Sequence, residues 1–149
     1  MVTTPLTTPL STSLTGARRD ELAAHLKAHG LRTTLPRLML ADLLFAQGNR
    51  HVTAEILHAE ARMAGLKVSQ ATIYNTLNQF SEAGLLREVQ VDQARSYFDT
   101  NLDEHHHFYV EEEGRLIDIP QEAIALERLP DSPKGFEIAG VDVVIRLSK

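Results

Sequence analysis

The clearest structural signal in the sequence is the amphipathic stretch SQATIYNTLNQFSEAG, at residues 69–84. Ser69 can cap a helix and Gly84 can end one, so the stretch predicts a helix over residues 70–83. One face of that helix is apolar, because Ile73, Leu77 and Phe80 recur at helical spacing. The opposite face is uncharged and rich in amide groups: Ala71, Tyr74, Asn75, Asn78 and Gln79.

Three further helices are expected before this stretch and a β-hairpin after it. Capping residues, glycines and apolar spacing predict helices from Arg18 to Gly30, from the cap Thr34 to Gly48, and from the cap Thr53 to near Gly65, the last with Ile56 and Leu57 pointing inward. Two strands, residues 85–91 and 95–100, flank a loop at residues 92–94. Helices followed by such a hairpin predict a winged helix-turn-helix.

The last third of the chain predicts a small α/β unit. Short strands are expected at residues 108–110 and 115–119, a helix from Pro120 to about Leu129, and a strand within residues 136–147. A unit of this size is too small to be stable alone, so we expect it to dimerise. The predicted fold class is α+β, with a disordered tail (residues 1–17), a winged-helix DNA-binding domain (18–100) and an α/β dimerisation and sensing domain (101–149).

Composition excludes several classes of protein. The chain has 149 residues, 43% hydrophobic and 23% charged, and no stretch approaches the roughly 20 apolar residues of a membrane-spanning helix. It contains no cysteine, which excludes disulfides, a thiolate nucleophile and cysteine-ligated zinc or iron–sulfur sites. Any metal must therefore bind to His, Asp and Glu.

Charge is distributed unevenly along the chain. Residues 1–98 hold ten Lys and Arg against eight Asp and Glu, whereas residues 99–149 hold five against twelve. The first part is therefore the one able to approach a polyanion. The uncharged residues 1–16 lack the features of a secretion signal, which predicts a cytoplasmic location.

A run of three histidines is the strongest single chemical feature. On a strand, His105 and His107 would share a face while His106 points the other way. Asp99, Asp118 and His51 could complete a nitrogen and oxygen shell suited to Zn, Fe or Mn. The alternatives are a solvated strand edge or a tag-like remnant, and His25, His29 and His58 are expected to be solvated surface residues.

Four segments together resemble the ferric uptake regulator (Fur) family. They are GLRTTLPR at residues 30–37, HVTAE at 51–55, ATIYNTLNQF at 71–80 and the histidine run, in the family's order and spacing. Lack of cysteine and the triple histidine resemble its iron response regulator (Irr) branch. The resemblance implies a homodimeric, DNA-binding repressor of iron and haem homeostasis that reads AT-rich palindromes.

The resemblance also implies roles for residues of the first domain. Tyr74 and Asn75 would lie near base edges, since Asn can pair with adenine and Tyr can contact a thymine methyl group or a phosphate. Tyr74 could instead be a partly buried aromatic under the wing. Arg32 would reach the minor groove, and the rest of the implied DNA-binding set is Arg37, Ser69, Gln70, Ala71 and Arg95.

The family's regulatory site, which joins the two domains, maps onto His51, Asp99, His105, His107 and Asp118. The family's usual cysteine pair is replaced by Val110 and Glu113, so that structural zinc site should be absent. A second metal or haem site is matched in part by Glu104 and His106, with Val141 in place of a usual histidine. The Irr-like branch further implies haem as a ligand of the histidine run.

An enzyme is the rival hypothesis from another class. A small metal-dependent hydrolase could use His105 and His107 as ligands. Such enzymes usually have further histidine or aspartate ligands downstream, whereas no histidine follows His107 here. A metal-buffering dimer without DNA binding is a third hypothesis, which would leave the amide-rich face of residues 70–83 without a role.

Overall fold

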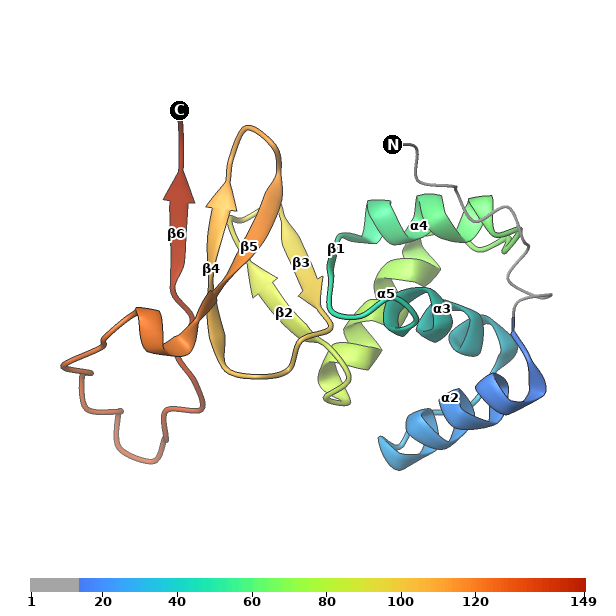
Figure 1. Cartoon of the computed structure of the whole chain (residues 1–149). Helices are drawn as coiled ribbons and strands as arrows, with labels where there is room; N and C mark the ends of the chain where they lie inside the picture. The colour runs from blue at the N-terminus through green and yellow to red at the C-terminus, as the bar shows by residue number, and fades with distance from the viewer. Residues whose placement is uncertain (1–13) are drawn as a thin grey trace. The chain divides into compact units, whose positions relative to one another are not determined.

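The computed structural model describes residues 14–149, which divide into two compact units (Figure 1). The first unit ends at Leu102 and the second runs from Asp103 to Lys149. Both helices and sheets are present, which confirms the predicted α+β class. Most of the predicted tail, residues 1–13, lies outside the described residues, and the first described helix begins at Gly16 rather than at Arg18. None of the helices in the described part is long and apolar enough to cross a membrane.

Four helices make up most of the first unit. They are α2 (Gly16–Ala28), α3 (Leu35–Phe45), α4 (Ala54–Met63) and α5 (Gln70–Glu82). Each starts at a hydroxyl side chain that accepts a hydrogen bond from the backbone amide three residues later, which satisfies an amide that the helix itself leaves unpaired. These capping residues are Thr15, Thr34, Thr53 and Ser69, the last three as predicted.

The helices enclose one hydrophobic core. The apolar face predicted for α5 is confirmed, because Ile73, Leu77 and Phe80 are completely buried. The prediction for Ile56 was wrong, since 41% of its surface is exposed. Neighbouring helical residues point about 100° apart, and α4 directs Leu57 rather than Ile56 into the core.

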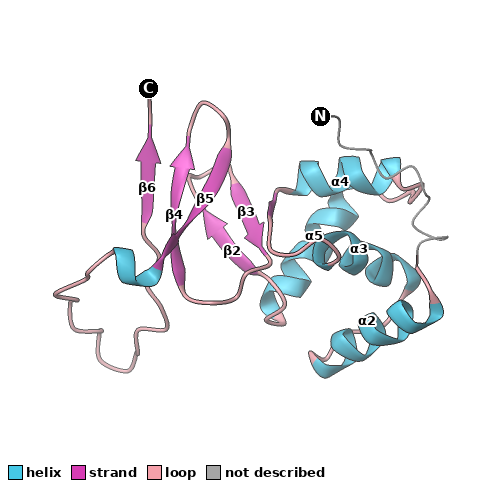
Figure 2. Ribbon diagram, in the orientation of Figure 1, coloured by secondary structure: helices cyan, strands magenta, loops and turns pink. Residues whose placement is uncertain are grey.

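A three-stranded antiparallel sheet completes the first unit (Figure 2). The predicted hairpin is confirmed as β2 (Arg87–Gln90) and β3 (Ser96–Asp99). The sequence did not predict β1 (His51–Val52), which pairs with the other side of β3, so that the strand order is β1-β3-β2. Helices α4 and α5 followed by this wing form a winged helix-turn-helix.

The second unit contains a mixed three-stranded sheet. Its strands are β4 (His105–Val110), β5 (Arg115–Pro120) and β6 (Val144–Leu147), in the order β5-β4-β6. β4 runs antiparallel to β5 and parallel to β6. The strand predicted within residues 136–147 is therefore limited to its last part.

The helix predicted from Pro120 to Leu129 was wrong. Only a short 3₁₀ turn, η1 (Gln121–Ala123), forms there, without a side-chain cap. A helix in a protein is stabilised mainly by burial of its apolar face, but Leu126 and Leu129 are each 45% exposed in the single chain. The segment therefore lacks the tertiary contact that a helix would need.

Candidate functional site

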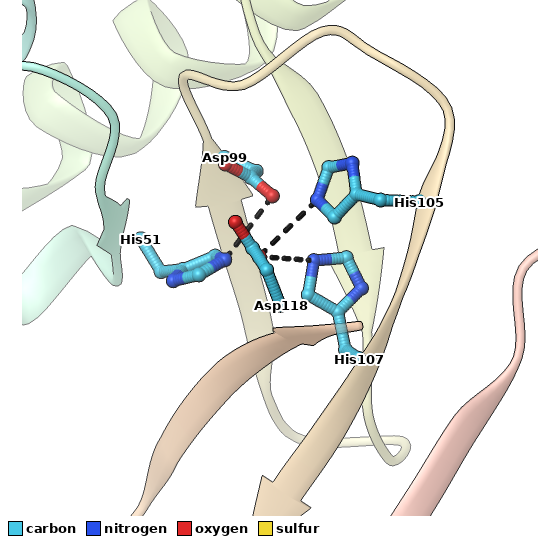
Figure 3. Close-up of side chains that lie close together, drawn as sticks. All are labelled: His51, Asp99, His105, His107 and Asp118. Atoms are coloured by element: carbon cyan, nitrogen blue, oxygen red, sulfur yellow. Dashed lines mark ion pairs between the residues drawn. The ribbon is translucent and has the colours of Figure 1, made fainter. Parts of the chain in front are cut away.

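The pairing of β1 with β3 creates the first group of candidate ligands. His51 lies directly opposite Asp99 in the strand register, while Val52 and Phe98 point into the core. His51 Nε2 is 3.1 Å from Asp99 Oδ2, and the Asp99 side chain is only 1% exposed (Figure 3). The backbone amide of Asn101 donates to Asp99 Oδ1 at 2.9 Å. A buried carboxylate is thus held with one oxygen directed at an imidazole.

Arg50, for which the sequence indicated no role, anchors β1. The backbone amide of Arg50 donates to the Thr100 hydroxyl at 2.8 Å. Its guanidinium forms a two-pronged ion pair with Glu60 of α4, at 3.0 and 2.5 Å, and also donates to the Leu43 carbonyl at 3.2 Å. The residue next to His51 is therefore tied to α3 and α4 by charged hydrogen bonds, the stronger class.

The second group of candidate ligands lies in the other unit, on β4 and β5. His105 and His107 lie on the same face of β4, as predicted, with ring centroids 4.5 Å apart. Their Nε2 atoms lie 3.3 and 3.4 Å from the same Asp118 oxygen (Figure 3). The register places Asp118 opposite His107. Two imidazoles therefore converge on one carboxylate oxygen.

The hydrogen bonding of His105 decides what that cluster can bind. Its Nδ1 lies 2.5 Å from the Asp103 carbonyl oxygen, which only accepts, so Nδ1 carries the hydrogen. A neutral His105 then presents the Nε2 lone pair to the lone pairs of Asp118. That contact is favourable only with a proton or a metal ion between the two atoms. The donor set consequently fits a cation that accepts nitrogen and oxygen ligands.

Glu104 and His106, which partly match the family's second metal or haem site, each form a hydrogen bond within the protein. His106 is buried, and its Nδ1 accepts a hydrogen bond from the backbone amide of Val143 at 3.1 Å. Glu104 is exposed and accepts from the Gln121 side chain at 2.8 Å. One His106 nitrogen is thus used in holding the chain that leads into β6.

The side chains predicted to contact DNA are accessible in the first unit. Tyr74 and Asn75 are exposed on α5. The Tyr74 ring is 45% exposed and lies T-shaped to Phe98 of the wing at 6.5 Å, so the alternative of a partly buried aromatic remains compatible with its position. Arg37 is half-buried. The remaining residues of the predicted set are all exposed: Arg32, Ser69, Gln70, Ala71 and Arg95.

Two polar contacts at this surface were not predicted. The Arg37 guanidinium donates to the Gln79 amide oxygen at 2.5 Å and to the Arg32 carbonyl at 3.2 Å. At the start of α5, Gln70 donates to Glu55 at 3.3 Å. Gln79 lay on the predicted polar face, but only the tertiary structure could show that it contacts Arg37.

Comparison with known proteins gives a consistent result. The sequence profile of the ferric uptake regulator family matches residues 28–146. The ferric uptake regulation protein of Klebsiella pneumoniae is 34% identical over 104 residues, which span 69% of this chain and 67% of the relative. The structure of the ferric uptake regulator from Pseudomonas aeruginosa with manganese is similar, with a TM-score of 0.63, 28% identity and coverage of 85% of this chain and 96% of that one. A zinc-bound manganese uptake regulator is also similar, with a TM-score of 0.58, 25% identity and coverage of 87% and 96%.

Proposed function

Since the chain belongs to the ferric uptake regulator family, we propose that it is a repressor of iron and haem homeostasis genes whose operator binding responds to a divalent metal. Family members are DNA-binding, metal-responsive transcription regulators and not enzymes, so the hydrolase hypothesis is set aside. The observation that carries the proposal is the pair of incomplete ligand groups, one in each unit.

We propose that the two groups bind one cation together. His51 and Asp99 offer two ligand atoms, while His105, His107 and Asp118 offer three. The first group has fewer ligands than a well-held zinc ion and the second leaves one position open, whereas together they provide five. Two carboxylates among neutral imidazoles also balance the charge of a divalent ion. Mn²⁺, Fe²⁺ and Zn²⁺ all accept such mixed shells, and manganese and zinc are the ions named for the two related structures.

The proposed switch follows from where the ligands are attached. A bound cation would cross-link β1 and β3 of the winged helix to β4 and β5 of the second unit. Arg50 contacts α3 and α4, so the orientation of β1 is coupled to these helices, and α4 in turn packs against α5. In a dimer, this cross-link would set the separation of the two α5 helices, and so the match to a palindrome.

The proposed DNA surface is the exposed face of α5. Asn75 and Tyr74 would read base edges of an AT-rich palindrome, and Ser69, Gln70 and Ala71 lie at the end of α5 that approaches the backbone. Arg32 would enter the minor groove, while Arg37 and Arg95 would neutralise phosphates. The contact between Arg37 and Gln79 supports this proposal, because it holds the positively charged guanidinium beside the exposed face of α5.

We assign dimerisation to residues 104–149. Apolar side chains of this unit, including Phe136 at 72% and Ile138 at 48% exposure, are accessible in the single chain. A second copy would cover them, and would supply the packing that the segment after Pro120 lacks. Sedimentation should therefore give a dimer, and a stable monomer would contradict the assignment.

The native signal is proposed to be a metal ion rather than haem. His105 and His107 are 5% and 0% exposed, which suits a small ion better than a macrocycle that must approach an imidazole edge. Lack of cysteine and the triple histidine nevertheless support placement in the Irr-like branch, where the resemblance implies a haem response. We propose a cytoplasmic location, where operators and the metal pool meet.

The decisive experiment is a DNA-binding titration of the full chain repeated with Mn²⁺, Fe²⁺, Zn²⁺ and haem. We expect one of the metals to change operator affinity, and the double variant His105→Ala/His107→Ala to lose that response while apo DNA binding is retained. His58→Ala is the matched control, because it removes a histidine from α4 outside both ligand groups. A metal response unchanged in the double variant would contradict the site, and a response to haem alone would contradict the choice of signal.

A further inference from the structure

A pair of histidines on α2 lies outside both ligand groups. His25 and His29 are four residues apart at the end of the helix, where His29 is the C-terminal cap (α2 in Figure 1). Residues at this spacing share one face, and their ring centroids are 4.9 Å apart. The same spacing allows two histidines of a helix to bind one zinc ion in metalloproteases.

The hydrogen bonding of His29 prepares it as a ligand. Its Nδ1 lies 2.9 Å from the backbone carbonyl oxygen of His25. Because a carbonyl oxygen only accepts, the hydrogen is on Nδ1 and the Nε2 lone pair remains for a cation. Histidines that bind metals usually have this arrangement, with the second ring nitrogen donating to a carbonyl or carboxylate.

His25 is oriented by packing and kept neutral by its surroundings. Its ring meets the edge of Phe45 at 5.8 Å and 90°. Partial burial lowers the pKa of His25, the neighbouring His29 lowers it further, and Glu21 opposes the shift. The neutral imidazole is the form that binds metals, so protons compete less for this nitrogen than for a solvated histidine.

From this geometry we propose that His25 and His29 form a second cation site, specific for borderline divalent ions such as Zn²⁺ that prefer imidazole nitrogen. Water completes its shell. Glu21 lies one turn earlier on the helix, exposed and paired with Arg18 at 3.4 Å, and its negative charge favours positive charge at His25. The sequence predicted that His25, His29 and His58 are solvated surface residues. His25 is exposed, whereas His29 and His58 are half-buried, each with a ring nitrogen against a backbone carbonyl. The proposed site gives His25 and His29 a role that depends on their mutual orientation. With fewer protein ligands, it should bind more weakly than the five-ligand site proposed above.

The test uses Zn²⁺ and the full chain carrying His105→Ala and His107→Ala, so that the competing group is disabled. The imidazole NMR signals of the five remaining histidines are followed during titration, together with calorimetry. We expect the signals of His25 and His29 to shift together. Replacing His25 with Ala should weaken Zn²⁺ binding by at least about tenfold, since even losing a partner of a ligand costs roughly 10–100-fold.

The matched control keeps the number of histidines constant. Ala24→His/His25→Ala moves one imidazole by about 100° around the helix, at an exposed position, and should bind as weakly as the single variant. Circular dichroism checks the helix content, and His29→Gln repeats the test if replacement of His25 disturbs α2. The proposal would be overturned if Ala24→His/His25→Ala bound Zn²⁺ as strongly as the protein that retains His25. It would also be overturned if the signals of His25 and His29 did not shift during the titration. Because two of the five ligands of the regulatory site are absent from this background, either result leaves that site's own test unaffected.

Discussion

Replacing Asp99 with Asn should separate the stability of the apo protein from the stabilisation that a metal adds. The amide has the shape of the carboxylate and keeps an oxygen for the Asn101 amide, but removes a charge that is 1% exposed. Hydrogen bonds of the charged group are worth about 1 kcal/mol more than neutral ones, whereas burying the charge costs several kcal/mol. These effects oppose each other, so the free energy of unfolding without metal should change by less than about 2 kcal/mol.

With metal the expected difference is larger. At a Mn²⁺ concentration 100 times its Kd, binding stabilises the unmodified protein by about 2.7 kcal/mol. If loss of the anionic ligand weakens binding about 100-fold, as much as losing a group that hydrogen-bonds a ligand can, the same Mn²⁺ concentration adds only about 0.4 kcal/mol. Urea unfolding in chelator and in Mn²⁺ measures both quantities for each protein.

Asp42→Asn is the matched control for this experiment. Asp42 is also a buried carboxylate of the first unit, but it pairs with Arg18 at 3.0 Å and belongs to neither ligand group. Its replacement should lower stability equally in chelator and in Mn²⁺. If Asp99→Asn keeps the full stabilisation by Mn²⁺, Asp99 is not a ligand and the proposed joint between the units is wrong.

Three further results are expected. Ser69→Ala should lower the free energy of unfolding by about 1 kcal/mol in urea denaturation, because Thr72 N loses its partner at 3.1 Å, and a smaller loss is expected for Ser69→Thr. Asn75→Ala should weaken operator binding by about 1–3 kcal/mol in fluorescence anisotropy but leave random duplex unaffected, and equal losses on both would contradict base reading. His25 has a pKa below its ordinary 6.5 in the folded state, so the unfolded chain binds more protons and stability falls as the pH drops below that value. His25→Gln should flatten this part of the pH dependence, and an unchanged profile would show that the neutral form is not favoured by folding.

Local features predicted much of the first unit. The caps Thr34, Thr53 and Ser69 act within one helical turn, so their neighbours in the sequence suffice to identify them. The same holds for the apolar face of α5, because helical periodicity relates residues only a few positions apart. Alternation along β4 likewise placed His105 and His107 on one face.

The predictions that were wrong concern features that depend on contacts between residues far apart in the sequence. Helical periodicity could not tell which of two adjacent apolar residues, Ile56 or Leu57, faces the core, since that depends on where α5 packs. The segment after Pro120 has helix-forming composition, yet without burial of its apolar residues only a single turn is formed. In both cases, tertiary packing outweighs the local sequence pattern in deciding the structure.

By itself, the sequence determined the ligand types, because a chain without cysteine can offer only histidine and carboxylate, and it determined the amphipathic helix that exposes Asn75. Tertiary structure decided how the ligands are paired. β1 is two residues long, too short to carry a recognisable pattern, and it exists only because β3, more than 40 residues later, supplies its hydrogen-bonding partners. That non-local register places His51 opposite Asp99, and no property of either residue's neighbours encodes it.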